Sequence, residues 1–160
     1  MRKKIVLALV AFLALSLLGE ASAADNGAPA GKLLRQGVSD ESTYFIMVDR
    51  FENGDPSNDN AGFIAGNPAG GFDPTDPGYW HGGDLKGVTK HLTYVKQMGF
   101  TSIWITPPVK QKYLQGSSAG YHGYWGLDFT TIDPHLGTEA DFKDMVARAH
   151  ELGLKVIIDV

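Results

Sequence analysis

The sequence contains no cysteine among its 160 residues. This absence excludes disulfide bonds, thiolate metal sites, iron–sulfur clusters and cysteine-linked lipid anchors. An excess of basic residues is also absent, because 14 Lys and Arg are set against 18 Asp and Glu, for a net charge of -4. Proteins that bind nucleic acid carry a basic surface, so we expect no nucleic-acid partner.

The composition is otherwise that of an ordinary globular protein. Apolar residues make up 43%, aromatic residues 11% and charged residues 20% of the chain. These fractions exclude a disordered or low-complexity protein. The 20 glycines and 8 prolines are more than a compact helical bundle usually carries, and they favour a loop-rich α/β or β protein.

Residues 1–23 have the pattern of a secretory signal peptide. Basic residues at 2–4 precede an apolar run at 5–18, and Ala-Ser-Ala at 21–23 provides a cleavage site. The run is shorter than the about 20 residues of a membrane span, although an uncleaved anchor is an alternative. We therefore predict a secreted protein, extracellular or periplasmic, with no membrane attachment after cleavage. Residues 24–40, rich in Ala and Gly, are predicted to be a linker.

The rest of the chain alternates between predicted strands and helices. Short apolar runs at 44–48, 100–105 and 154–160 predict strands, the first of them buried on both faces. Apolar residues spaced by three and four predict helices at 85–98 and 138–152. This order is typical of parallel β-α-β units and predicts an α/β fold.

Three strands are too few for a complete fold of this class. A (β/α)8 barrel needs about 250 residues, and a doubly wound sheet has about six strands. The last apolar run continues to the final residue, Val160. We therefore expect residues 41–160 to be the N-terminal part of a larger domain, about three βα units that end inside the third strand.

Two long segments rich in loop-forming residues follow the first two predicted strands. They comprise residues 52–81 and 109–137, whereas the helix-to-strand connections at Gly99 and Gly153 are short. Functional sites of parallel α/β proteins are built at the carboxyl ends of the strands. We expect the functional site in these two loops.

The first loop contains a group of oxygen-bearing side chains. Asn53, Asp55, Asn58 and Asp59 lie within seven residues, and Asp84 follows later. Calcium is bound by six to eight oxygens from carboxylates, amides, main-chain carbonyls and water. Asn, Asp, Gly and Pro also favour turns that need no ion, so the pattern has two interpretations, a calcium site and a series of turns.

The second loop contains four aromatic rings, a histidine and a carboxylate within residues 121–129. Sugars present apolar CH faces bordered by hydroxyl groups, so rings beside polar groups suit a sugar ligand. The alternative is a loop that packs by its own aromatic residues. Asp49 and Asp159 end predicted strands at the same side, where a buried carboxylate needs either a salt-bridge partner or a functional role.

Five segments of the chain together resemble the alpha-amylase family, glycoside hydrolase family thirteen. They are residues 44–59, 82–87, 99–108, 121–128 and 156–160. The resemblance is to secreted bacterial alpha-amylases and the related cyclodextrin glucanotransferases. It implies a (β/α)8 TIM barrel that acts on α-1,4-glucans such as starch.

The resemblance also assigns residues to sites. It implies a calcium cofactor, with ligands at Asn53, Asp55, Asn58, Asp59, the Gly82 carbonyl and Asp84. His122 matches the residue that hydrogen-bonds the sugar before the scissile bond, and Tyr124 matches the ring stacked on that sugar. Trp125 is expected to support this substrate-binding loop, and Asp159 matches an aspartate that supports the active site.

The nucleophilic aspartate, the acid/base glutamate and the third aspartate of the family fall after Val160. The segment therefore contains no catalytic residue, and we expect it to be inactive alone. The complete protein is expected to be a retaining glycosidase, in which one carboxyl group protonates the leaving oxygen and another forms a glycosyl intermediate. A transglycosylase and a non-catalytic carbohydrate- or calcium-binding relative are the alternatives. We expect a monomer with an α-glucan substrate.

Overall fold

The computed structural model describes residues 40–160. The predicted signal peptide, 1–23, and all but the last residue of the predicted linker, 24–40, lie outside the described residues. Within the described part, every helix is too short or too polar to cross a membrane.

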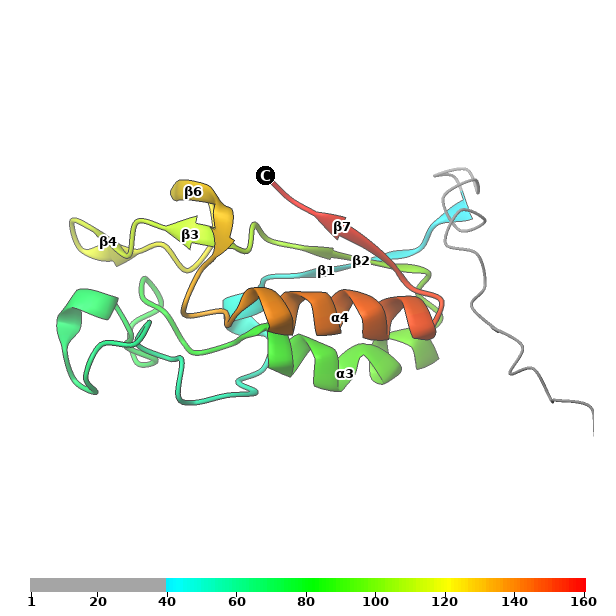
Figure 1. Cartoon of the computed structure of the whole chain (residues 1–160), viewed down its shortest axis with the longest axis horizontal. Coiled ribbons are helices and arrows are strands. Elements are labelled where there is room, and N and C mark those ends of the chain that lie inside the picture. Colours follow the sequence, from blue (N-terminus) through cyan, green and yellow to red (C-terminus); the bar gives the residue numbers. More distant parts are fainter. Residues whose placement is uncertain (1–39) are drawn as a thin grey trace, which may run out of the picture. The chain divides into compact units, whose positions relative to one another are not determined.

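Three parallel strands form the central sheet (Figure 1). They are β1 (Thr43–Ile46), β2 (Ser102–Ile105) and β7 (Lys155–Ile158), in the order β1-β2-β7. Phe45 pairs with Trp104, which in turn pairs with Ile157. The three predicted strands are confirmed, each shorter than its apolar run.

Two helices connect the strands. The helices are α3 (Leu85–Gln97) and α4 (Glu139–Glu151), as the apolar spacing predicts. The carboxylate of Asp84 caps α3 by accepting a hydrogen bond from the Gly87 N–H at 2.7 Å. Thr138 and Asp141 form a capping box at the start of α4. Both helices lie side by side on the same side of the sheet (Figure 1).

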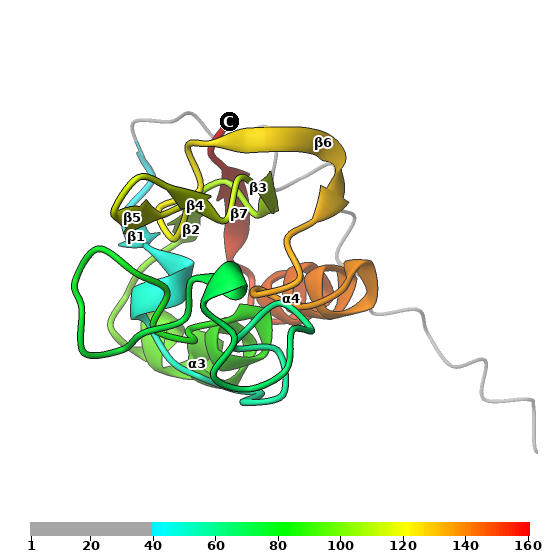
Figure 2. The same ribbon diagram turned by 90° about the vertical axis from the view of Figure 1, so that its left-hand side faces the viewer.

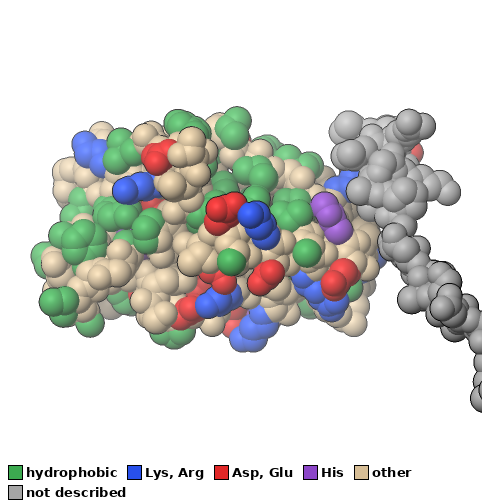
Figure 3. Space-filling model, in the orientation of Figure 1, with side chains coloured by type: hydrophobic (Ala, Val, Ile, Leu, Met, Phe, Trp, Pro, Cys, Tyr) green, Lys and Arg blue, Asp and Glu red, His purple; other side chains and the backbone are tan. Residues whose placement is uncertain are grey.

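The hydrophobic core lies between the helices and one face of the sheet. Ile46, Ile103 and Ile105 contribute from the strands, Leu92 and Met145 from the helices, and all are at most 1% exposed. Charged side chains of both signs cover the outer surface of the helices (Figure 3). Burial of one helix face against the sheet is the main source of stability for such a layer.

The opposite face of the sheet is not buried by the described residues. Phe45, Trp104 and Ile157 lie in register on this face and are 47%, 40% and 43% exposed. The prediction that the strand at 44–48 is buried on both faces is therefore wrong for this chain. In addition, β1 ends at Ile46, and Val48–Arg50 forms a short 3-10 helix.

The segment 109–137 is not the continuous loop that the sequence predicts. Strand β3 (Val109–Gln111) pairs antiparallel with β6 (Gly126–Ile132), and β4 (Leu114–Gln115) pairs with β5 (Ser118–Ala119). Strand β6 lies beyond the carboxyl ends of the central strands (Figure 1), on the side away from the helices (Figure 2). Its apolar residues Leu127 and Phe129 are more than 60% exposed, so its apolar pattern does not mark a buried face.

Candidate functional site

The turn after β1 is built around the buried carboxylate of Asp49. It forms an ion pair with Arg50 and accepts hydrogen bonds from the main-chain N–H groups of His81, at 2.9 Å, and Gly82, at 3.1 Å. Burial raises the pKa of Asp49, and the two N–H donors and Arg50 oppose this shift. Of the two roles considered for Asp49, the structure shows the salt bridge.

Arg50 connects the first loop to the second. Its guanidinium group donates to the carbonyls of Tyr79, at 2.9 Å, and Pro77, at 2.7 Å. The same group lies over the ring of Tyr121, 3.9 Å from the ring centre, in a cation–π contact. Arg50 therefore fixes the start of the aromatic motif against the end of the first loop.

Three of the predicted calcium ligands meet at one point. The side-chain amide of Asn53 donates to Asp59 Oδ1 at 2.7 Å. Gly82 lies directly beside this pair, because a Cβ atom at Gly82 would be 2.7 Å from the same Asp59 oxygen. Gly82 has a φ of +89°, which also favours glycine.

Asp84 holds the other side of this loop. It is fully buried, and its Oδ2 accepts hydrogen bonds from the N–H groups of Gly54, at 3.0 Å, and Asp55, at 2.7 Å. The Asn58 amide lies 3.5 Å from the same oxygen. Asp84 thus joins the first loop to the N-terminus of α3 as well as capping that helix.

The carboxylate of Asp55 is engaged elsewhere. It forms an ion pair with Lys86 at 2.5 Å and accepts a hydrogen bond from the Ser57 hydroxyl. The Lys86 hydrogen bond, followed by those from Ser57, lowers the pKa of Asp55 to about 2. The predicted ligands therefore form two groups, Asn53, Asp59 and Gly82 in one and Asn58 and Asp84 in the other, while the carboxylate of Asp55 is held by Lys86 of α3.

Two features of this loop suit a bound cation. The Asn58 Oδ1 atom is buried without a hydrogen-bond partner. Burial, together with the negative charges of Asp84 and Asp55, raises the pKa of Asp59, whereas the Asn53 amide opposes the shift. Within residues 40–160, no three Asp, Glu, His or Cys side chains form a metal cluster. Amide and main-chain oxygens would therefore have to complete a calcium site here.

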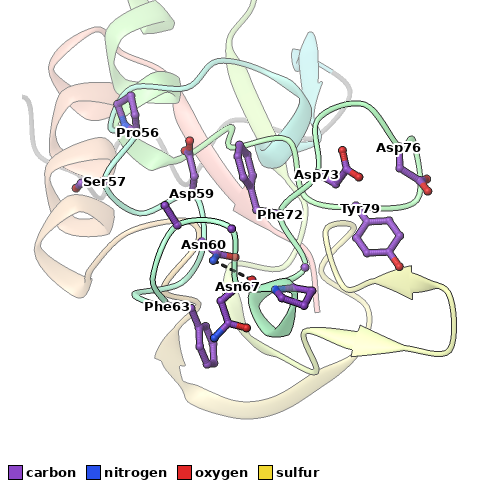
Figure 4. A pocket seen from close by; sticks show the side chains of 14 residues that line it. Pro56, Ser57, Asp59, Asn60, Phe63, Asn67, Phe72, Asp73, Asp76 and Tyr79 are labelled. Atoms are coloured by element: carbon purple, nitrogen blue, oxygen red, sulfur yellow. Dashed lines mark hydrogen bonds between the residues drawn. The ribbon is translucent and has the colours of Figure 1, made fainter.

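A hollow of about 690 Å³ opens beside this loop (Figure 4). Its lining includes Asp59, Asn60, Phe63, Phe72, Asp73 and Tyr79. None of the lining residues belongs to the aromatic motif of the second loop. The hollow therefore belongs to the predicted calcium loop and is separate from the predicted sugar site.

The aromatic motif places His122 and Tyr124 next to one another. Their rings are stacked, with centres 5.8 Å apart and an angle of 16° between the planes. His122 Nδ1 accepts a hydrogen bond from the Tyr124 N–H at 3.0 Å. Burial lowers the pKa of His122, which favours the neutral ring. In this state Nε2 carries the proton.

Tyr124 and Asp159 come together although they are far apart in the sequence. The Tyr124 hydroxyl donates a hydrogen bond to Asp159 Oδ2 at 2.6 Å, and this bond raises the pKa of Tyr124. The Asp159 N–H donates to the Ile105 carbonyl at 3.1 Å, which continues the pairing of β2 and β7. Tyr124 is 52% exposed, so much of its side chain is free to contact a ligand.

Trp125 lies against the same histidine. Its ring contacts the His122 ring edge to face, with centres 4.7 Å apart. Its main-chain N–H donates to the side-chain oxygen of Gln111 at 2.7 Å. Three predicted site residues and Asp159 thus form one cluster at the carboxyl end of the sheet.

A buried pair of Asp133 and His135 is not predicted by the sequence. His135 Nδ1 lies 2.8 Å from Asp133 Oδ1, and Nε2 lies 2.8 Å from the Gly70 carbonyl oxygen. The ring is stacked on Trp80, with centres 4.1 Å apart and planes 4° apart. The only sequence signal is a histidine two residues after an aspartate, which is too common a pattern to identify such a pair.

Comparison with known protein families identifies the chain. The family described as "Alpha amylase, catalytic domain" matches residues 45–160. The chain belongs to the alpha-amylase family. This match confirms the resemblance in the five sequence segments.

Individual relatives include both hydrolases and transferases. A "Beta/alpha-amylase" of Paenibacillus polymyxa is 48% identical over 76% of this chain and 9% of its own length. An "Alpha-amylase" of Streptomyces lividans is 53% identical over 56% of this chain and 10% of its own length. A "Cyclomaltodextrin glucanotransferase" of Klebsiella oxytoca is 42% identical over 74% of this chain and 18% of its own length.

Solved structures show the same relationship. An Anoxybacillus alpha-amylase matches with a TM-score of 0.66 at 45% identity, over 78% of this chain and 24% of that one. The chain therefore spans less than a quarter of the length of these relatives.

Proposed function

We propose that this chain is part of an enzyme that acts on α-1,4-glucans. The observation that carries the proposal is the cluster of His122, Tyr124 and Asp159 at the carboxyl end of the sheet. Tyr124 offers a half-exposed aromatic ring, and His122 offers a neutral imidazole that can donate a hydrogen bond. The Asp159 carboxylate lies within hydrogen-bond distance of the Tyr124 hydroxyl. These groups suit the apolar face and hydroxyl groups of a glucose unit.

The chain's own residues have defined roles in this proposal. Tyr124 stacks on the sugar before the scissile bond, and His122 donates its Nε2 proton to a sugar oxygen. Asp159 orients the Tyr124 hydroxyl, and Trp125 supports the loop. The nucleophile and the acid/base residue of the retaining mechanism are proposed to follow Val160, so the 160-residue chain alone is expected to be inactive.

We also propose that the sheet is part of a (β/α)8 barrel. The strands follow one another in sequence order, both helices lie on one face, and the other face carries an apolar row, Phe45, Trp104 and Ile157. In a barrel that row faces the interior, which is filled by layers of side chains from all strands. A barrel accounts for apolar residues on both faces of these strands.

A transglycosylase is the second candidate, because a cyclomaltodextrin glucanotransferase is 42% identical over 74% of this chain. The residues described here serve both reactions, since both begin with a glucan in the same site. A non-catalytic carbohydrate-binding relative is a further alternative. Product analysis of the complete protein distinguishes the three: linear oligosaccharides, cyclic products or no products from starch.

The experiment measures release of reducing ends from soluble starch by the full-length protein. We expect Tyr124→Ala to lower kcat/KM at least tenfold, equivalent to about 1.4 kcal/mol of transition-state stabilisation. The matched control is Tyr94→Ala, which removes a tyrosine of similar exposure, 54% against 52%, from the surface of α3. Equal losses in both variants would overturn the proposed role of Tyr124.

We propose that the first loop binds calcium through Asn53, Asn58, Asp59, the Gly82 carbonyl and Asp84, whose carboxylate also organises the loop. The resemblance includes Asp55 as a ligand, but its ion pair with Lys86 favours its main chain or a bridging water over its carboxylate. Calcium would supply positive charge that compensates Asp59 and Asp84 and would cross-link the loop. It is not proposed to take part in the chemistry.

Calcium removal tests this site through stability. In the full-length protein we expect a chelator to lower the thermal midpoint of unfolding and added calcium to raise it again. In Asp59→Asn we expect added calcium to raise the midpoint by less. Asp144→Asn, which removes an exposed carboxylate from α4, is the control. An unchanged calcium shift in Asp59→Asn would contradict the assignment.

We propose export, extracellular or periplasmic, on the basis of the signal-peptide pattern at residues 1–23. A monomer remains our prediction for the complete protein. Both are tested on the secreted product, by its N-terminal sequence and its molecular mass in solution.

A further inference from the structure

Gln111 is a buried polar residue that the proposed sugar contacts do not use. It lies at the end of β3 and is 1% exposed. Both ends of its side-chain amide are occupied. The oxygen accepts the Trp125 N–H at 2.7 Å, and the nitrogen donates to the Val109 carbonyl at 2.7 Å.

The need for this amide follows from the irregular pairing of β3 and β6. The register shifts between Val109 and Lys110 and again between Lys110 and Gln111. At such shifts some main-chain groups have no ladder partner. Trp125 precedes β6, and its carbonyl accepts the Lys112 N–H at 2.9 Å, whereas its own N–H is satisfied by a side chain.

Gln111 is itself held from the other side by Asp133. The Gln111 main-chain N–H donates to Asp133 Oδ2 at 2.7 Å, and Asp133 is fully buried. Asp133 Oδ1 accepts from the N–H of His135 at 2.9 Å and lies 2.8 Å from its Nδ1. The other ring nitrogen, Nε2, lies 2.8 Å from the Gly70 carbonyl oxygen, so the ring bridges Asp133 and the first loop.

These bonds connect a buried part of the molecule to the sugar-binding motif. Tyr124 directly precedes Trp125, and His122 accepts the Tyr124 N–H. The position of the Trp125 main chain therefore helps to determine the positions of the His122 and Tyr124 rings. The Tyr124 side chain is half exposed, and its other restraints are the hydrogen bond to Asp159 and the stacking on His122.

We propose that Gln111, held by Asp133, is a positioning residue that fixes the Trp125 main chain and so orients His122 and Tyr124 toward the glucan. Gln111 does not touch the sugar. The inference rests on the proposed glucan-binding function of those two residues.

The first test is Gln111→Met in the full-length protein, because Met has a similar volume but offers the Trp125 N–H only a weakly accepting thioether. We expect its KM for maltoheptaose and its dissociation constant for maltotriose to rise about tenfold. The control is Gln115→Met, which makes the same change at an exposed position in β4 and is expected to leave both constants within twofold. Thermal unfolding of both variants reports whether they are folded.

A second variant, Gln111→Glu, separates hydrogen bonding from packing. A protonated glutamic acid matches the amide, since one oxygen accepts and the hydroxyl donates. Once ionised, the carboxylate no longer donates to the Val109 carbonyl, and two acceptors then face each other. We therefore expect affinity for maltotriose, relative to that of the unmodified protein, to be near normal at low pH and to fall as pH rises.

The outcomes distinguish this inference from the proposed function. If the unmodified protein neither cleaves starch nor binds maltotriose, the proposed function fails. If it binds but Gln111→Met behaves like Gln115→Met, the positioning role is overturned. If Gln111→Met does not fold, Gln111→Glu decides: a relative affinity that falls with pH supports the role, and one independent of pH overturns it.

Discussion

At the scale of single residues, the protonation of His122 is the most informative property of the site. Its Nδ1 can accept the Tyr124 N–H only while that nitrogen is unprotonated. Burial lowers the pKa of the ring in the folded protein. In the unfolded chain the pKa of His122 has its ordinary value of about 6.5. At a pH between the folded-state and unfolded-state pKa values, the unfolded chain therefore binds more protons than the folded chain.

This difference predicts a pH dependence of stability. The stability that comes from His122 is fully present above about pH 6.5 and is lost as pH falls toward the folded-state pKa. We expect the thermal midpoint of the full-length protein to fall more between pH 7.5 and 5.5 than that of His122→Gln. Glutamine keeps an acceptor but does not titrate in this range. Equal slopes would contradict the prediction, and His150→Gln, at an exposed position on α4, is the control.

The residues that sequence reasoning found differ in kind from those it missed. His122, Tyr124 and Asp159 were predicted because they belong to segments that resemble a family, and the structure places them together. Asp133, His135 and Gln111 were missed. Each acts through a partner that is either far away in the sequence or a main-chain group. Composition and spacing contain no information about which carbonyl a buried histidine will meet.

At the scale of elements, the contact between the first loop and α3 depends on glycine. A Cβ atom at Gly87 would be 1.9 Å from the Glu52 carbonyl oxygen, and one at Gly54 would be 2.3 Å from the Gly87 nitrogen. The loop main chain therefore packs directly on the first turn of the helix. This close approach brings Asp84 within reach of the Gly54 and Asp55 N–H groups.

Gly87→Ala tests this packing. Alanine is favoured over glycine inside a helix by about 1 kcal/mol, but here we expect a loss of about 1–3 kcal/mol from overpacking. The free energy of unfolding of the full-length protein, measured in urea, would show the sign. Gln97→Ala, at the exposed end of the same helix, is expected to change stability by less than about 0.5 kcal/mol. A stabilised Gly87→Ala would refute the steric argument.

The elements that the sequence predicts correctly are those with a buried stripe. The periodic apolar residues of α3 and α4, with caps at Asp84 and Thr138, determine both helices. Strand β6 was missed because its apolar residues, Leu127 and Phe129, are exposed rather than alternating into a core. Its partner β3 is short and irregular, so tertiary pairing rather than local pattern forms this ribbon.

At the scale of the whole molecule, the row of Phe45, Trp104 and Ile157 dominates the behaviour of this segment on its own. Three partly exposed apolar side chains lie in register on one face, and Phe45 and Trp104 are in edge-to-face contact with ring centres 5.4 Å apart. Such a contiguous surface promotes association in water. The sheet order also leaves β1 and β7 as edges of the central sheet.

We therefore expect a chain of residues 24–160, produced alone, to self-associate and to lack a cooperative thermal transition. Trp104→Lys is expected to reduce the association measured by light scattering. Tyr94→Lys, which adds the same charge on the surface of α3, is expected to have a smaller effect. A monomeric chain that unfolds cooperatively would contradict this expectation.

The polar network around Gln111 is almost complete within one stretch of the chain. The side chains of Gln111, Asp133 and His135 find their hydrogen-bond partners within residues 109–135, apart from the carbonyl of Gly70. That one outside acceptor lies in the short 3-10 helix Pro68–Gly70 of the first loop, where a Cβ atom at position 70 would be 2.1 Å from Asn60 Oδ1. The network of the second loop therefore depends on a glycine in the first.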